Sequence, residues 1–114
     1  MVDRIPAWIN FTTQNIDNSF DGIYVALDNY EWKYPKPDWK NKNIKIYEVH
    51  IGMSGVDYKV HGFTHFKEVV LPKIVELGYN VIQIMGVMEH PYYGSFGYHV
   101  SNFFSVSSRF GKPH

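Results

Sequence analysis

Three absences limit what this 114-residue chain can be. It has no cysteine, which excludes a disulfide scaffold and any thiolate metal site and fits a reducing compartment. It has no charge excess, since 11 Lys and Arg balance 11 Asp and Glu, so we predict neither a nucleic-acid nor a membrane partner. It has no apolar run of the roughly 18 residues that span a bilayer. We therefore expect a soluble, cytoplasmic chain of one modest domain at most, with its oligomeric state undetermined.

Aromatic residues, by contrast, are abundant and make up 18% of the chain. Phe, Tyr and Trp fill protein cores with large buried areas, and their faces also stack on the rings of bound ligands such as sugars. Composition does not separate these two uses, so both remain open for any single aromatic side chain.

The chain divides into two segments of different character, residues 1–43 and residues 44–114. The first holds all three tryptophans, a turn signal at Asp21-Gly22 and a Pro-containing stretch at residues 34–38. It predicts one or two short strands followed by an extended connection, with a solvated boundary at residues 41–43. The second begins with a period-two pattern over residues 44–52, which predicts a strand with Ile46 and Glu48 on the same face.

The second segment continues as strand, helix, strand. Apolar residues at helical spacing predict a helix over residues 64–77, with Thr64 as its N-cap, Gly78 as its C′ residue and a kink at Pro72. Residues 81–88 are too apolar to be solvated on either face, so they predict a second, fully buried strand. Two buried strands joined by a helix indicate a right-handed βαβ unit and an α/β fold.

The loop after the second strand carries the candidate binding residues. It is rich in aromatics, Gly and His and leaves the carboxyl end of a buried strand, where α/β proteins bind ligands. Tyr98 can stack on a ring and His99 can hydrogen-bond its hydroxyls; alternatively, this loop is a packed aromatic hinge that closes over the strand ends. His61 and His65 are spaced four apart but lack the further ligands of a metal centre, so no metal site is predicted.

Two carboxylates could carry chemistry. Glu48 lies in the first predicted strand and Glu89 at the exit of the second. Neighbouring strands are about 4.8 Å apart, and a retaining glycosidase holds two carboxyls about 5–5.5 Å apart. The alternative is that each carboxylate forms local hydrogen bonds, Glu48 within the sheet and Glu89 with the turn at His90-Pro91.

A longer set of motifs resembles the 1,4-α-glucan (glycogen) branching enzymes of the α-amylase clan, in their eukaryotic form. In chain order these are Ile46-Tyr47-Glu48-Val49-His50-Ile51-Gly52, Leu71-Pro72-Lys73-Ile74, Leu77-Gly78-Tyr79-Asn80, Glu89-His90-Pro91-Tyr92-Tyr93-Gly94-Ser95-Phe96-Gly97-Tyr98-His99 and Ser107-Ser108-Arg109-Phe110-Gly111. Arg4-Ile5-Pro6-Ala7-Trp8 and Lys33-Tyr34-Pro35-Lys36-Pro37 resemble the end of that family's N-terminal carbohydrate-binding β-sandwich and its linker.

The resemblance implies an architecture. Residues 1–43 are expected to be the tail of the β-sandwich, and residues 44–114 the first strand, first helix and second strand of a (β/α)₈ TIM barrel with the following loop. Such a barrel typically needs about 250 residues, and it keeps its site at the carboxyl ends of its strands. The chain therefore resembles a fragment, and we expect it to be molten or aggregation-prone in isolation.

The resemblance also implies a function. The family transfers an α-1,4-linked glucan segment to a 6-hydroxyl in glycogen biosynthesis, with retention and without a cofactor. Its tyrosine matching Tyr98 lines the subsite of the sugar whose bond is broken; the position matching His99 is more often Gln. No acid of this chain matches the family's catalytic carboxylates, so we expect no activity from the chain alone. Its partner would be an α-glucan such as glycogen or amylose. The alternatives are a non-catalytic glucan-binding or interaction module and a small enzyme that uses Glu48 and Glu89.

Overall fold

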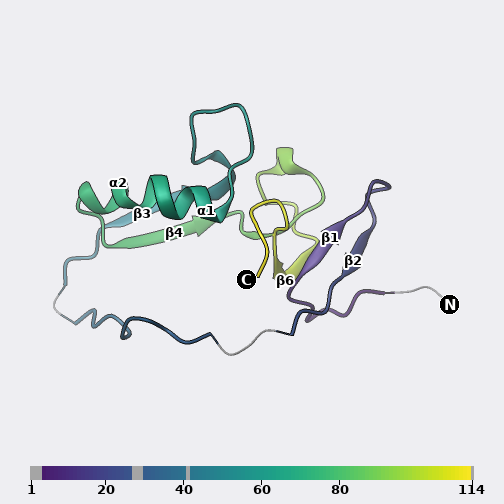
Figure 1. The fold of residues 1–114 in the computed structure, drawn as a ribbon, viewed down its shortest axis with the longest axis horizontal. Helices are drawn as coiled ribbons and strands as arrows, with labels where there is room; N and C mark the ends of the chain where they lie inside the picture. The colour runs from purple at the N-terminus through teal and green to yellow at the C-terminus, as the bar shows by residue number, and fades with distance from the viewer. Residues whose placement is uncertain (1–3, 27–29, 41, 114) are drawn as a thin grey trace.

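The computed structural model describes residues 4–26, 30–40 and 42–113, and it contains three two-stranded sheets (Figure 1). Strands β1 (Thr12–Gln14) and β2 (Phe20–Gly22) are antiparallel, β3 (Ile46–His50) and β4 (Val81–Met85) are parallel, and β5 (Met88–Glu89) and β6 (Asn102–Val106) are antiparallel. Asn41, expected at the boundary between the two segments, lies outside the described residues. The described chain is thus a small α/β structure, as predicted.

The β1–β2 hairpin is closed by a turn rich in Asn, Asp and Ser. Asn18 has φ +64°, the left-handed conformation that Asn tolerates better than most residues. Ser19 donates from its hydroxyl (2.6 Å) and its amide (3.0 Å) to Oδ1 of Asp17. These hydrogen bonds favour the carboxylate form and lower the pKa of Asp17. The first segment therefore forms one hairpin, whose turn lies at residues 15–19. The turn expected at Asp21-Gly22 is wrong, because both residues belong to β2 and pair with β1.

Helical residues join β3 to β4, as the spacing predicts. They comprise α1 (Phe63–His65), the π-helical turn η2 (Phe66–Val70) and α2 (Leu71–Glu76). Pro72 lies in the first turn of α2, and the irregularity falls just before it. In η2 the Leu71 amide donates to the Phe66 carbonyl, five residues back, so the wider turn accommodates the proline.

The two ends of the helix differ in how well the sequence anticipates them. The N-cap is Gly62 and not Thr64, and no side chain caps this end of the helix. The Phe63 amide instead donates to the Phe110 carbonyl at 2.8 Å. A contact distant in sequence thus replaces the expected cap. Gly78 does end the helix, with φ +82° and its amide on Val75 O at 2.9 Å, a Schellman-type C-terminus.

The helix covers one face of the β3–β4 sheet, and the core lies between them. Its buried members are Val49 of β3, Ile51 directly after β3, Phe66 and Ile74 of the helix, and Phe110. The opposite face is open, and Ile46 on it is 52% exposed. The expectation of two fully buried strands is therefore wrong, because a second layer is needed to cover that face.

The second strand is also shorter than predicted. β4 ends at Met85 because Gly86, with φ +63°, turns the chain out of the sheet. Met88 and Glu89 then form β5, which leaves the parallel pair and joins β6. The apolar run of residues 81–88 thus belongs to two sheets.

The described chain is extended for its length. Its radius of gyration is 16.3 Å, against about 13 Å for a compact domain of this size. Residues 23–26, 30–40 and 42–45 run along the outside of the molecule between the hairpin and β3, while β1 lies beside β6 (Figure 1). Among the described residues no helix is long and apolar enough to cross a membrane.

We predict that the purified 114-residue chain does not unfold in one sharp transition. A two-stranded parallel sheet with an open apolar face buries too little surface to offset the entropy of ordering the chain. Thermal unfolding followed by near-ultraviolet circular dichroism, with dye binding to exposed apolar surface as a second probe, tests this. A cooperative melt with no dye binding would contradict the prediction.

Candidate functional site

The site lies at the carboxyl ends of β3 and β4, where two connections meet. After β3 the chain forms the 3₁₀ turn η1 (Ile51–Met53), and after β4 it passes through β5 into the loop of residues 90–101, which contains the 3₁₀ turn η3 (Tyr93–Ser95). The Tyr93 hydroxyl donates to Sδ of Met53 at 3.6 Å, so the two connections touch. Strand ends of this kind are where parallel sheets carry binding residues.

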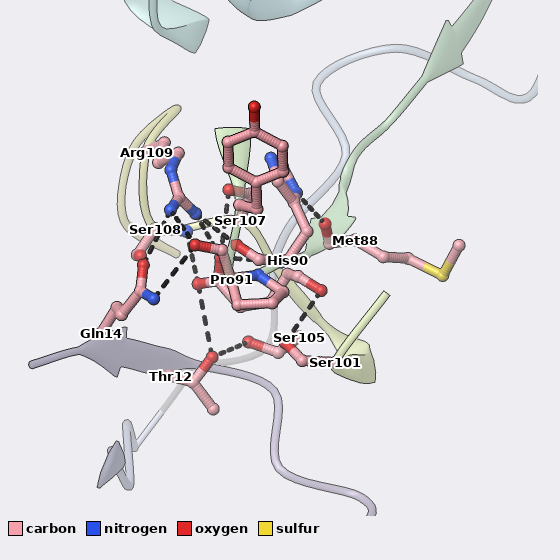
Figure 2. A network of polar contacts seen from close by, with 12 residues as sticks. Thr12, Gln14, Met88, His90, Pro91, Ser101, Ser105, Ser107, Ser108 and Arg109 are labelled. Carbon is pink, nitrogen blue, oxygen red and sulfur yellow. Dashed lines mark hydrogen bonds and ion pairs between the residues drawn. The ribbon is translucent and has the colours of Figure 1, made fainter. Parts of the chain in front are cut away.

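Glu89 anchors the base of this loop. Its side chain is fully buried, and its carboxylate accepts five hydrogen bonds (Figure 2). The donors are the amides of Ser108 (2.9 Å) and His90 (3.1 Å), the hydroxyls of Ser107 (3.2 Å) and Thr12 (3.4 Å), and Nη1 of Arg109 (3.4 Å). These donors replace the water that a buried carboxylate loses.

The Thr12 hydroxyl also hydrogen-bonds the Ser105 hydroxyl, and its donation to Glu89 sets the direction of this second bond. Ser105 Oγ lies 3.0 Å from Thr12 Oγ1. Because Thr12 has one hydroxyl hydrogen and gives it to Glu89, the Ser105 hydroxyl donates to Thr12. Three strands (β1, β5 and β6) therefore share one chain of polar contacts.

Arg109 extends the network to β1 and to the first residues of the loop. It is the counter-charge of Glu89, with 22% of its side chain exposed. Its Nη1 also donates to the His90 carbonyl, and its Nη2 donates to Gln14 Oε1 at 2.7 Å and to the Pro91 carbonyl at 3.0 Å. Since Pro91 O also accepts from Gln14 Nε2 at 3.1 Å, the start of the loop is held from two sides.

The end of the loop returns to the same residue. The Ser101 amide donates to the Glu89 carbonyl at 2.9 Å, and the Ser101 hydroxyl donates to the same oxygen at 3.2 Å. Residues 90–101 are therefore pinned at both ends on Glu89, through its side chain and its backbone.

Tyr98 and His99, the predicted binding residues, lie at the exposed part of this loop. Tyr98 is 73% exposed and His99 is exposed, so the faces of both rings are accessible. Tyr93 and Phe96 provide the packing instead: their ring centres are 6.1 Å apart and lie 6.4 and 6.0 Å from that of His50, the last residue of β3. Within this loop, Tyr98 and His99 are therefore exposed, while Tyr93 and Phe96 pack against His50.

The structure does not bring Glu48 and Glu89 together as a pair. Glu48 is exposed on the open face of β3, where its register partner is Gln83, whereas Glu89 pairs with Asn102 in another sheet. The carboxylate of Glu89 is occupied by its five donors. The local interpretation of Glu89, which included a hydrogen bond to the His90 turn, is what the structure shows.

His61 and His65 are neighbours without a metal geometry. Their ring centres are 4.0 Å apart, and Nε2 of each is buried with no partner in the described ranges. A Cβ at Gly55 would collide with Nε2 of His61, so backbone fills the position in front of that nitrogen. Within residues 4–26, 30–40 and 42–113 no three His, Cys, Asp or Glu side chains form a cluster that could hold a metal.

Sequence patterns alone miss most of the Glu89 network. Thr12 and Arg109 are 77 and 20 residues from Glu89, and the contacts of Thr12 with Ser105 and of Arg109 with Gln14 join residues 93 and 95 apart. No local periodicity encodes such separations. The available signal was the motif at residues 107–111, which the resemblance singled out without assigning it a role.

Comparison with known proteins shows the family. No protein-family model matches the chain. It is 48% identical over 118 residues to a 1,4-alpha-glucan-branching enzyme of Solanum tuberosum, and 49% identical over 112 residues to one of Dictyostelium discoideum. It is also 48% identical over 115 residues to 1,4-alpha-glucan-branching enzyme 2-2, chloroplastic/amyloplastic, of Arabidopsis thaliana. These alignments cover 98%, 96% and 97% of this chain.

The chain therefore belongs to the family of 1,4-α-glucan-branching enzymes. It spans only 14% of the length of the Solanum and Arabidopsis relatives and 16% of the Dictyostelium relative. Because the identity is high, this chain can replace the aligned segment of the Solanum tuberosum relative in a fusion protein. We call this fusion protein the chimera.

We predict that Glu89→Gln weakens the loop of residues 90–101 in the chimera by about 1–3 kcal/mol. Glutamine keeps the shape of the side chain, but its NH₂ group cannot accept the hydrogen bonds that one carboxylate oxygen accepts. The substitution also removes the negative charge opposite Arg109. Native-state proteolysis of the loop measures the free energy of its opening. Glu48→Gln is the matched control and should change that energy by less than about 0.5 kcal/mol, because Glu48 is exposed. Equal effects from both substitutions would contradict the assignment.

Proposed function

We propose that this chain forms one wall of the α-glucan cleft of a branching enzyme, and that it contributes substrate contacts but not the bond-breaking groups. The observation that carries the proposal is the placement of an exposed Tyr98 on a loop pinned at the carboxyl ends of parallel strands. Such strand ends hold the active sites of (β/α)₈ barrels. The parallel β3–β4 pair with its intervening helix then corresponds to the start of such a barrel.

Tyr98 and His99 are the proposed substrate-binding residues. The accessible face of the Tyr98 ring suits stacking on a glucose ring, whose C–H groups form an apolar face. Both nitrogens of an exposed imidazole can exchange hydrogen bonds with sugar hydroxyls, which gives His99 its role. A rigid support beneath exposed contact residues is the arrangement that binding sites require.

The proposed reaction of the whole protein is transfer of an α-1,4-linked glucan segment to a 6-hydroxyl, in glycogen or starch synthesis. Retention requires a carboxylate nucleophile and a carboxylic acid that protonates the leaving oxygen. Glu89 cannot be either one, since its oxygens are buried and already bonded. We assign no catalytic residue to this chain and propose that the catalytic carboxylates belong to other parts of the longer protein.

The remaining assignments follow from the same proposal. Residues 1–43 would be the tail of a carbohydrate-binding β-sandwich with its linker, and residues 44–114 the N-terminal part of the barrel. The partner is an α-glucan, and the proposed chemistry requires no cofactor, nucleic acid or membrane. We propose a cytoplasmic location, whereas the Arabidopsis relative is named as a chloroplastic/amyloplastic enzyme.

The second candidate is a glucan-binding module without catalysis. It is favoured by one observation: the binding side chains are accessible while the buried carboxylate is unavailable for chemistry. The two candidates differ in whether substitution of Tyr98 changes turnover or only retention on a glucan.

We predict that Tyr98→Ala lowers kcat/KM of the chimera for amylose by about tenfold, since an aromatic contact contributes about 0.5–1.5 kcal/mol beyond area burial and about 1.4 kcal/mol is a factor of ten. Tyr98→Phe should change it by less than about threefold, because the ring remains. Tyr24→Ala, at another exposed tyrosine, serves as the control. Unchanged kcat/KM for Tyr98→Ala would overturn the proposed role of Tyr98.

We predict that the 114-residue chain alone does not branch amylose. The described residues offer no accessible pair of carboxylates at the strand ends, since Glu89 is buried and Glu48 lies on the open face. Loss of the iodine colour of amylose, followed with the chimera as positive control, measures the activity. Branching by the chain alone that disappears in Glu89→Gln would revive the small-enzyme hypothesis.

A further inference from the structure

We propose that His50 is a positioning residue, whose imidazole holds the loop segment of residues 93–98 in the conformation that presents Tyr98. The inference rests on the proposed function, because it assumes that Tyr98 contacts the glucan. It adds a residue of β3, a different strand from the one that leads into the loop.

His50 connects the end of β3 to the loop that follows β4. It is the last residue of β3 and lies opposite Met85, the last residue of β4. Its Nε2 is 3.1 Å from the carbonyl oxygen of Phe96, two residues before Tyr98. A carbonyl can only accept, so Nε2 carries the hydrogen and His50 donates.

The loop needs such a contact because its backbone is unfavourable at this point. Phe96 has φ +53° and Gly97 has φ +86°, two consecutive left-handed residues. For a residue with a large side chain this conformation costs about 1–2 kcal/mol. Phe96 N donates to Tyr93 O at 2.8 Å and Tyr98 N to Ser95 O at 3.0 Å, which leaves the Phe96 carbonyl to be held by His50.

Two glycines let the loop come close enough for this hydrogen bond. A Cβ on Gly86 would collide with Phe96 O and would lie 2.9 Å from Nε2 of His50. A Cβ on Gly97 would collide with the backbone of Gly86. The loop therefore rests directly on the end of β4, with the imidazole beside the contact and no side chain between the two backbones.

Aromatic rings surround the imidazole of His50, whose hydrogen bond is the one from Nε2 to Phe96 O. The rings of Tyr93, Phe96 and Phe110 have centres 6.4, 6.0 and 5.6 Å from that of His50, each nearly perpendicular to it. The other nitrogen, Nδ1, is buried and has no partner in the part of the chain that the structure describes. His50 is therefore placed to fix the loop rather than to touch a substrate.

The test compares His50→Gln with His50→Asn in the chimera. The amide nitrogen of Gln is separated from Cα by the same number of bonds as Nε2 of histidine, so it can still donate to Phe96 O. The Asn side chain is one methylene shorter and cannot reach that oxygen. We expect His50→Asn to lower kcat/KM for amylose by about fivefold, the weight of one hydrogen bond, and His50→Gln to retain it within about twofold. Equal loss in both variants, or loss in neither, overturns the proposal.

A double substitution separates positioning from general destabilisation. If His50 acts through Tyr98, His50→Asn combined with Tyr98→Ala should lower kcat/KM no further than Tyr98→Ala alone. Multiplied defects would contradict the proposal, because a merely structural loss acts independently of Tyr98. Lys59→Ala, on the exposed part of the connection after β3, serves as the control and should leave kcat/KM within about twofold.

Hydrogen exchange distinguishes failure of this inference from failure of the proposed function. We expect the Tyr98 amide of the chimera to exchange about fivefold to tenfold faster in His50→Asn than in His50→Gln, whatever Tyr98 binds. Faster exchange with unchanged kcat/KM in Tyr98→Ala would retain the His50 contact and reject the role of Tyr98. Identical exchange in the two His50 variants would reject the contact itself.

Discussion

A carboxylate that is buried without solvent must have its lone pairs filled, and the arrangement of this chain follows from how Glu89 meets that requirement. Its five donors come from β1, from the residue that follows it and from the segment after β6. Removal of any one segment would leave a buried charge short of partners. The hairpin, the second antiparallel pair and the base of the loop are therefore fixed relative to one another by a single side chain (Figure 2).

The loop of residues 90–101 has two supports of different kinds. At its base, charge-assisted hydrogen bonds to the Glu89 carboxylate and from Arg109 hold the start of the loop, and the backbone carbonyl of Glu89 holds its end at Ser101. At its tip, backbone contact at Gly86 and one hydrogen bond from His50 set the turn before Tyr98. Polar groups carry the support, while the aromatic face of Tyr98 stays accessible. This separation lets a loop be both well positioned and available for binding.

Local rules anticipated the local features of this chain. Alternation located β3 within residues 44–52, helical spacing located the helix, and the need for a positive φ identified Gly78 as the residue that ends it. The misses have different causes. Gly62 replaced Thr64 as the N-cap because the distant Phe110 carbonyl accepts from the first amide, and β4 ended early because Gly86 adopts a positive φ. The strands are not fully buried because one face of their sheet has no covering layer. The exposure of Tyr98 was open from sequence alone, since stacking and packing use the same ring.

The burial of Glu89 also bears on where the chemistry of the longer protein can lie. A general acid or nucleophile must present an oxygen to the substrate, which means that at least one lone pair or proton is free when the substrate arrives. Each oxygen of Glu89 already accepts from backbone and side-chain donors, and exposing it would break the contacts that hold the loop. In this chain the carboxylate best placed near the strand ends is thus committed to structure. This commitment supports the proposal that Tyr98 and His99 bind the glucan and that the catalytic carboxylates belong to another part of the whole branching enzyme.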